Sequence, residues 1–408
     1  MENSEILVEN DIENDIESID NLEIYDSVYY NVKPSNNYKV YLKYYWKLLV
    51  IIGCFYILPS LQFLLFQIND NSIHCYYNNK CKKQFYFIPA FNNVISNLGY
   101  VIFGIIYILY VKNTKRDKNS KYGIHSDVSL YYSLGISLIW EGLFSSIYHL
   151  CPSKLNFQFD TTFMFIGIVL MYLTIFQKRN PEKLPGPPTI YMLLSVLIAL
   201  NIMALSDIFN GLNIYFWIPV LFGFIFFMIY STFYIYFGKK LEVDRDLIVK
   251  IPQYFKEIQY KDIPKIILLL FSYCITTFVA VFGLTDKSNF TDWILGNLIT
   301  NLFIYFIYYI IQKIYHNEQI SKIWVSLLIL SVLFMITSII FYNISVTNKL
   351  LSPEESDKLN KPCVLLDYFD YHDIWHILSS IGLFFMMINI YKIDNKLDNI
   401  KNSEINIF

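Results

Sequence analysis

The stretch YHDIWHILSSIGLFFMMINIYK, residues 371–392, decides how this chain must fold. It is an apolar run of about 20 residues, which is the length of a helix that crosses a membrane. His372 and His376 stand four residues apart at its start, so a helix places both side chains on one face. The stretch therefore predicts a membrane helix that begins with a pair of imidazoles.

The rest of the chain has the composition of an integral membrane protein. Its 408 residues are 55% hydrophobic and 16% charged, with a mean hydropathy of +0.39, whereas soluble proteins carry about 25% charge. The net charge of −2 indicates no particular polyanionic partner. Continuous apolar runs predict helices rather than a barrel. We therefore expect an all-α polytopic membrane protein with about ten transmembrane helices, at 48–67, 91–111, 129–149, 157–177, 189–206, 214–238, 264–285, 290–313, 321–343 and 371–392.

The N-terminal segment differs in composition from everything that follows it. Residues 1–40 are acidic and polar and show no secretory signal pattern. Such a segment buries too little apolar surface to fold alone. We expect a disordered acidic cytosolic tail at 1–40, with a short amphipathic helix as the alternative, and a transmembrane helical domain at 41–408.

The distribution of lysine and arginine predicts how the chain is oriented. The segments before the first span and after the second, fourth and sixth are rich in these residues, including Lys178 and Arg179. Such segments favour the cytosol, so both termini are expected there, and one lysine-rich loop at 80–83 falls outside against the trend. The sequons at Asn289 and Asn343 also fall in outer loops, where they are candidate glycosylation sites.

Four of the six cysteines fall in the expected outer loops, where disulfides persist. Cys75 and Cys81 share one loop, so we expect them to pair with each other. Cys151 and Cys363 would then form a second bridge that ties the third span to the tenth.

Five polar side chains share one face of the membrane in this reading. His149 ends the third span in SSIYH, four residues after Ser145, and Asp160 opens the fourth span. Together with His372 and His376 they place three imidazoles and a carboxylate at one depth. Such a set can hold a zinc ion with an open coordination position. The alternative is a group of interfacial histidines that only form hydrogen bonds.

Three further polar residues lie deeper in the expected spans. Glu141 is near the middle of the third span, where it is either a proton relay or a structural hydrogen-bond partner. Asn297 and Asn301 share one face of the eighth span and indicate hydrogen bonds between helices.

Several strings in the chain resemble the transmembrane half of the systemic-RNA-interference-defective (SID) family. They run in family order over about residues 73–408, as CYYNNKC, FNNVISNLGY, EGLFSSIYHLCP, NFQFDTTFMF, LLDYFDYHDIWHILS and the final INIF. That family is similar to the CREST superfamily of membrane hydrolases, which implies a CREST-like seven-helix core. The resemblance implies zinc ligands at His149, His372 and His376, a water-orienting carboxylate at Asp160 and an associated serine at Ser145.

The resemblance also implies what the protein does and where. The family is associated with uptake of double-stranded RNA and, in animal members, with cholesterol transport, at the plasma membrane or an endolysosomal membrane. The large β-rich extracellular region that usually precedes the first span is expected to be missing here, which weakens the case for RNA. The residues themselves favour a zinc-dependent hydrolase of a lipid amide or ester, such as a ceramide. A zinc ion that only locks the helices together is the third hypothesis.

Overall fold

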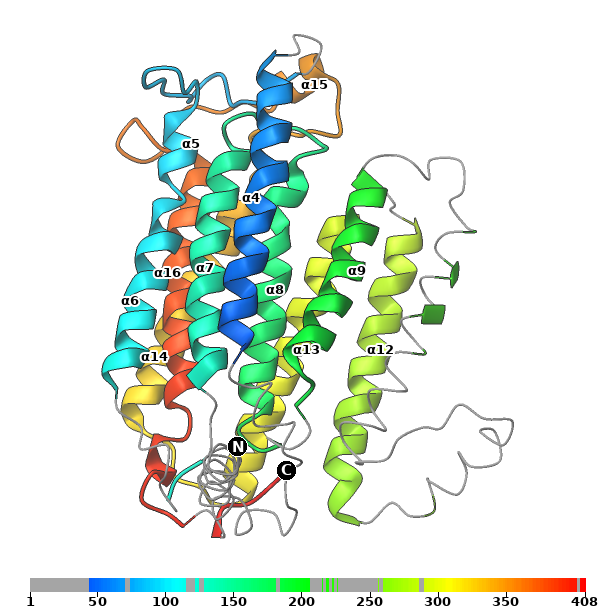
Figure 1. The fold of residues 1–408 in the computed structure, drawn as a ribbon, viewed down its shortest axis with the longest axis vertical. Coiled ribbons are helices and arrows are strands. Elements are labelled where there is room, and N and C mark those ends of the chain that lie inside the picture. The colour runs from blue at the N-terminus through cyan, green and yellow to red at the C-terminus, as the bar shows by residue number, and fades with distance from the viewer. Residues whose placement is uncertain are drawn as a thin grey trace, which may run out of the picture.

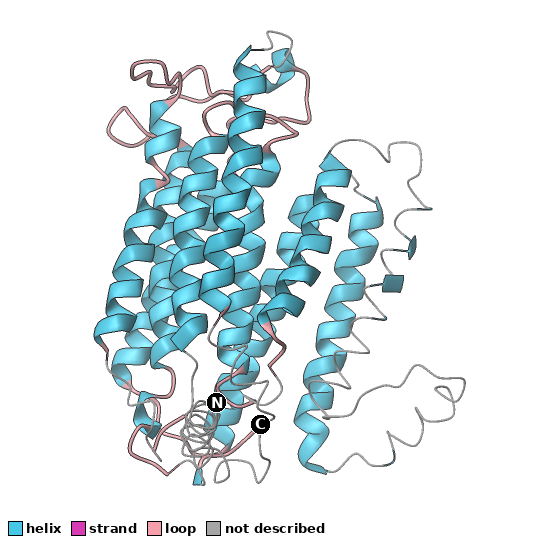
Figure 2. Cartoon of the chain, in the orientation of Figure 1, coloured by secondary structure: helices cyan, strands magenta, loops and turns pink. Residues whose placement is uncertain are grey.

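The computed structural model describes most of the chain beyond its N-terminal segment. The described residues are 44–69, 74–114, 122–124, 128–180, 184–205, 260–285, 290–401 and 404–408, with isolated residues between 215 and 256. Within these ranges the regular elements are helices, and pairing of extended chain is limited to three isolated bridges (Figure 2).

The long helices follow the apolar runs of the sequence. They are α4 (Tyr45–Asn69), α6 (Leu98–Asn113), α7 (Val128–Tyr148), α8 (Phe157–Phe176), α9 (Pro187–Leu205), α12 (Ile263–Thr285), α13 (Phe290–Tyr315), α14 (Lys322–Tyr342) and α16 (Tyr371–Lys392). Short helices α5 (Phe91–Ile95) and α15 (Pro353–Asp357) lie before α6 and α16, and single 3₁₀ turns precede α12 and follow α16. Among the described residues, seven spans are long and apolar enough to cross a membrane.

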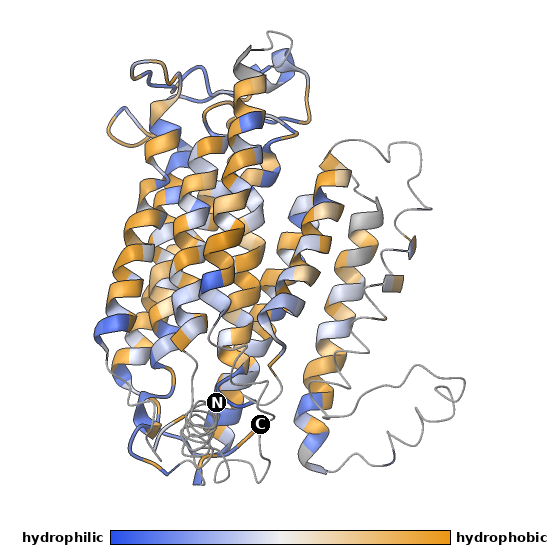
Figure 3. Cartoon of the chain, viewed as in Figure 1, coloured by the Kyte–Doolittle hydropathy of each residue, from blue (hydrophilic) through white to orange (hydrophobic). Residues whose placement is uncertain are grey.

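These helices confirm the expected fold class of an all-α polytopic membrane protein. Eight of the ten expected spans coincide with single long helices within about three residues at each end, and the span at 91–111 is divided between the short α5 and the long α6. Apolar residues cover the middle of the helices, and polar residues gather at their ends (Figure 3). The expected span at 214–238 and the acidic segment 1–40 lie outside the described residues, apart from isolated positions in the former.

Helix α7 is the central element of the main bundle (Figure 1). It packs against α4, α6 and α8, while α16 packs against α14 and α6. Two glycines allow α6 and α7 to approach closely: a Cβ atom on Gly104 would lie 2.7 Å from the carbonyl oxygen of Gly135. Small residues at such crossings are typical of helix packing in membranes. Helix α13 packs on α8 and links α12 to the bundle, while α9 contacts both α8 and α13.

Three loops, at 74–90, 149–156 and 343–370, gather at one end of the bundle, which we call the disulfide end. Two bridges join them: Cys75 is bonded to Cys151, and Cys81 to Cys363, each with a Cα–Cα distance of 4.9 Å. The expected pairing of Cys75 with Cys81 and of Cys151 with Cys363 is therefore wrong. Each bridge instead joins the first of these loops to a different one of the other two. The C-terminal residue lies at the opposite end of the bundle (Figure 1).

Candidate metal centre

Three histidines from two helices meet just below the disulfide end. His149 directly follows the last residue of α7, and His372 and His376 lie in the first two turns of α16. One ring nitrogen from each lies within 4.8 Å of the others, and the Nε2 atoms of His149 and His376 are 3.0 Å apart. A distance of 3.0 Å fits a hydrogen bond between the two rings and also fits two ligands of one ion. The structure thus brings together all three histidines of the sequence prediction in a group that can hold a metal ion.

The start of α16 is fixed by an N-terminal cap. Asp370 accepts hydrogen bonds from the backbone N–H groups of His372 and Asp373, at 2.9 and 3.0 Å. Asp373 reciprocates by accepting the backbone N–H of Asp370 at 3.0 Å, which completes a capping box. Asn78 and Asn92 donate from the neighbouring loop and from α5 to Asp370 and Asp373, at 2.9 and 2.8 Å. These bonds hold the first turn, and with it His372, against the bundle.

His376 has a hydroxyl next to its other ring nitrogen. The hydroxyl of Tyr100, on α6, lies 3.5 Å from His376 Nδ1 and 2.5 Å from the hydroxyl of Ser379. Metal-binding histidines usually use their second nitrogen for such an outer contact, which fixes the ring orientation. Tyr100 is therefore placed to orient His376 with Nε2 facing the other two imidazoles.

Ser145 and Asp160, the two other predicted site residues, lie beside the histidines and bond to each other. The Ser145 hydroxyl, on α7, donates a hydrogen bond to Asp160 Oδ1, on α8, and both side chains are buried. Glu141 lies one turn deeper on α7 and is also buried; its Oε2 finds no hydrogen-bond partner within the described part of the chain. Asp160 also lines the pocket described next.

A pocket of about 610 Å³ opens beside the histidines at the disulfide end. Its polar wall includes His149, His372 and Asp160. Its apolar wall is formed partly by Leu205, at the end of α9, and Leu295, on α13. A molecule in this pocket would therefore contact two of the three histidines and also apolar side chains of α9 and α13.

Two loop residues that the sequence reading did not single out also line the pocket. The ammonium group of Lys349 lies over the ring of Phe157, and burial lowers the pKa of Lys349 to about 7 although Asp160 favours its charged form. Burial raises the pKa of Tyr77 to about 12, and its hydroxyl donates to the backbone carbonyl of Leu150. Neither residue belongs to a periodic pattern, so the sequence alone carried no signal for them.

The fold and the site together define a class: a polytopic helical membrane protein with a largely buried three-histidine group beside a pocket at one end. Comparison with known proteins makes this more specific. The sequence model of the family described as "dsRNA-gated channel SID-1" matches residues 1–408. The chain therefore belongs to the SID family.

Individual relatives agree with the family match. The chain is 31% identical to SID1 transmembrane family member 1 of Mus musculus over 396 residues, which are 92% of this chain and 47% of the relative. It is 32% identical to the protein of that name from Rattus norvegicus, over 92% of this chain and 48% of the relative. Cholesterol uptake protein 1 of Caenorhabditis elegans is 30% identical, over 88% of this chain and 50% of the relative. The chain thus spans about half the length of these curated relatives.

Proposed function

We propose that this chain transports a sterol-class lipid and binds it in the pocket at the disulfide end. The observation that carries the proposal is the composition of the pocket, which has a polar wall at His149, His372 and Asp160 and an apolar wall at Leu205 and Leu295. A sterol has one hydroxyl group on a rigid hydrocarbon body, so it matches both walls. The similarity to a relative named Cholesterol uptake protein 1 supports the same ligand class.

We further propose that the ion held by His149, His372 and His376 is zinc. Three histidines with one position left open are a common zinc environment, and the mutual distances of the ring nitrogens fit a single ion. When bound, zinc supplies a Lewis acid to which an oxygen atom of a ligand can bind. Tyr100 keeps His376 oriented, and the Ser145–Asp160 pair offers a hydrogen-bond acceptor to a hydroxyl group in the pocket.

We propose that the disulfide end faces the extracellular or luminal side and that both chain termini are cytosolic. The two bridges support this orientation, because disulfides persist in oxidising compartments. The lysine and arginine bias of the loops agrees with it. Epitope tags at Met1 and Phe408 should remain hidden in unpermeabilised cells and become visible after permeabilisation. Staining of either tag on intact cells would contradict the orientation.

Double-stranded RNA is the second candidate cargo, favoured by the description of the matched family. RNA binding depends on neutralising phosphates with basic side chains. Lys80 and Lys82 are exposed at the disulfide end, but Lys83 is paired with Asp367 at 3.7 Å, and the acidic helix α15 lies at the same end. This mixed surface makes RNA the weaker match.

A zinc-dependent lipid hydrolase is the other candidate, and the Ser145–Asp160 hydrogen bond favours it. In that role Asp160 would take a proton from a water molecule in the pocket, while Ser145 holds its carboxylate in place. A ceramide or another lipid with an amide or ester near its polar end would fit the two-sided pocket. A zinc ion that is purely structural would need a fourth protein ligand.

Sterol binding can be tested by a substitution that fills the pocket from its apolar wall. Leu295→Trp places a large ring in the pocket, whereas Ile299→Trp adds the same ring one turn further on the exposed face of α13. Purified protein in sterol-containing nanodiscs is photolabelled with a diazirine sterol, and labelled peptides are identified by mass spectrometry. Label on the pocket residues that is lost in Leu295→Trp and kept in Ile299→Trp supports the proposal. Equal labelling of both variants at the pocket would reject it.

A further inference from the structure

Helix α13 carries a polar or tyrosine side chain at every fourth position along most of its length. These residues are Asn297, Asn301, Tyr305, Tyr309 and Lys313. All are buried except Asn301, which is half-buried. Sixteen residues of helix rise about 24 Å, most of the thickness of a bilayer's hydrocarbon core. Polar groups in such a row are expensive in hydrocarbon unless they have partners.

The first part of the row faces α12. Asn301 donates from Nδ2 to Thr276 Oγ1 at 3.2 Å and to Asn297 Oδ1 at 2.6 Å, and it accepts from the hydroxyl of Ser272. Asn297 Oδ1 accepts from the Thr276 hydroxyl at 3.4 Å, so both asparagines form the expected hydrogen bonds between helices. The row begins near the disulfide end, where Thr291 on the same helix lines the pocket.

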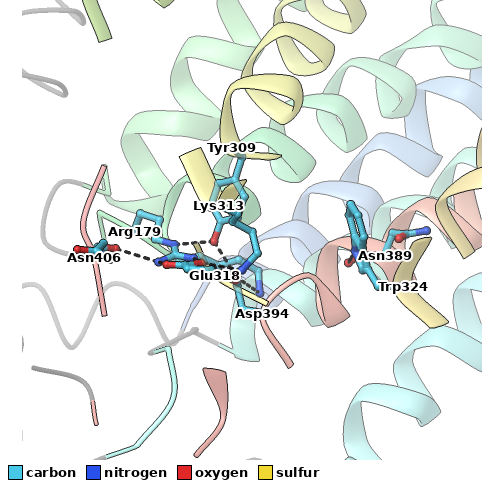
Figure 4. Close-up of polar contacts among 9 residues, drawn as sticks. Arg179, Tyr309, Lys313, Glu318, Trp324, Asn389, Asp394 and Asn406 are labelled. Atoms are coloured by element: carbon cyan, nitrogen blue, oxygen red, sulfur yellow. Dashed lines mark hydrogen bonds and ion pairs between the residues drawn. The ribbon is translucent and has the colours of Figure 1, made fainter. Parts of the chain in front are cut away.

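The last part of the row ends in a buried cluster of charges at the opposite end (Figure 4). The hydroxyl of Tyr309 donates to Asp394 at 2.7 Å and accepts from Arg179 Nε at 2.8 Å. Lys313 bonds to Asp394 and to Glu318, each at 2.8 Å. Arg179 also pairs with both carboxylates, at 2.7 Å and 3.0 Å. The row thus connects the pocket end of α13 to a largely buried ionic network.

Among the residues that the structure describes, several polar atoms along this route have no hydrogen-bond partner. They are Asn297 Nδ2, the hydroxyl of Tyr305, and Nδ2 of Asn201 on α9, whose side-chain oxygen accepts from Thr291 at 2.7 Å. Asn201 is 0% exposed, Tyr305 2% and Asn297 9%. Hydrogen bonds that merely join helices explain the paired atoms of the row but not these three. A buried polar group without a partner is costly, and a bound water molecule is its usual partner.

We propose that water occupies a seam along α13 that joins the pocket to the charged cluster. The seam passes Asn201 and Thr291 near the pocket, then Asn297 and Asn301 against α12, and then Tyr305. The seam binds water, and it runs along α13 as a site separate from the three-histidine group. The seam makes α13 a hydrated route between the two ends of the protein, whatever the pocket carries.

The first test measures access of Ag⁺, an ion close to water in size, to single cysteines. The two free cysteines, Cys54 and Cys274, are replaced by alanine in full-length protein in nanodiscs. Asn297→Cys and Tyr305→Cys sample the seam, whereas Ile299→Cys and Phe303→Cys sample the exposed face of the same helix, where the side chains are 46% and 54% exposed.

After exposure to Ag⁺ the protein is unfolded, and maleimide then labels only the thiols that have not reacted with Ag⁺. The seam thiols should react about tenfold faster than the lipid-facing thiols, because a thiol in a dry apolar environment ionises and reacts poorly. Equal rates in the two sets, whether fast or slow, would overturn the proposal.

The second measurement needs no substitution. Brief X-ray radiolysis in H₂¹⁸O labels side chains that lie next to bound water. Tyr305 should acquire ¹⁸O, while the adjacent Phe306, which is equally buried at 2% exposed and packs near Trp324, should not. Label at Tyr305 no higher than at Phe306 would overturn the proposal independently of how the cysteine variants fold.

Discussion

Asn78 donates a hydrogen bond of 2.9 Å to the carboxylate of Asp370, 292 residues further along the chain. Asp370 is the N-cap of the helix that carries two of the three histidines. Asn78 lies between the two cysteines, Cys75 and Cys81, that tether its loop to the α7–α8 and α14–α16 loops. The disulfide network thereby positions the cap, and the cap positions His372.

Removal of this cap should loosen the start of α16. Asp370→Ala leaves the backbone N–H groups of His372 and Asp373 without their acceptor. The expected loss is about 1–2 kcal/mol of stability, together with weaker metal binding because His372 loses its fixed position. Thermal unfolding in detergent and metal competition with a chelator measure both. Asp367→Ala is the control, since that side chain is 93% exposed; a similar loss in the control would contradict the capping role.

The double variant His372→Ala, His376→Ala should abolish metal binding. Wild-type protein is expected to contain about one zinc ion per chain, because three histidine nitrogens converge on one point. Elemental analysis of purified protein gives the metal content. His316→Ala removes a histidine at the opposite end of the bundle and should leave the content unchanged. Equal zinc in wild type and the double variant would refute the metal site.

Tyr100→Phe tests whether the second contact of His376 matters. The substitution keeps the ring and removes the hydroxyl that lies 3.5 Å from His376 Nδ1. Loss of such an outer contact commonly weakens metal affinity about 10–100-fold, and the length of this contact places the expected effect near the lower value. Zinc affinity from chelator competition is the measurement, with Tyr107→Phe on the same helix as the control. An unchanged affinity in Tyr100→Phe would mean that the hydroxyl does not orient the ligand.

Peptide mapping under non-reducing conditions should find Cys75 linked to Cys151 and Cys81 linked to Cys363. A linked peptide that contains Cys75 and Cys81 together would restore the pairing expected from the sequence.

Double replacement of Cys81 and Cys363 by serine should also destabilise the start of α16, because Cys363 precedes the cap by only seven residues.

The helices and the three-histidine group could be predicted because both depend on local patterns. Apolar runs set the spans, and the four-residue spacing of His372 and His376 fixes a shared face of one helix. His149 and Asp160 could be assigned to the same site because the ends of their two spans fall at the same depth in the membrane. These arguments need only helix geometry and the membrane's thickness.

The disulfides and the charged cluster could not be predicted in the same way. Four cysteines allow three pairings, and nearness in sequence favoured the wrong one because the loops fold across each other at the disulfide end. The sequence places Lys178 and Arg179 in a connecting segment whose charges favour the cytosol, yet both are buried, and Arg179 pairs with Glu318 and Asp394. Such ion pairs join residues more than 130 positions apart, so no local pattern reports them.

The substitution Asp160→Asn separates transport from hydrolysis. The asparagine side chain still offers an oxygen atom to the hydroxyl group of a ligand. Asp160 is not one of the three histidine ligands, so the zinc content should stay at the wild-type level. Sterol uptake into proteoliposomes should remain within a few-fold of wild type, because transport needs a hydrogen-bond acceptor rather than a base. Hydrolysis, if the pocket performs it, should fall about 10²–10⁴-fold, because an amide cannot accept the proton of an attacking water molecule.

Ser145→Ala is the matched control for this experiment. It removes the hydrogen bond to Asp160 and keeps the carboxylate, so it should reduce any hydrolysis less than Asp160→Asn does. Ceramides, esters and phospholipids are assayed by product mass spectrometry alongside sterol uptake by the same preparations. A collapse of uptake in Asp160→Asn with zinc retained would contradict the role of Asp160 as a simple hydrogen-bond acceptor, because transport would then require the charge of its carboxylate. Wild-type hydrolysis that disappears in Asp160→Asn while uptake persists would instead establish two activities in one pocket.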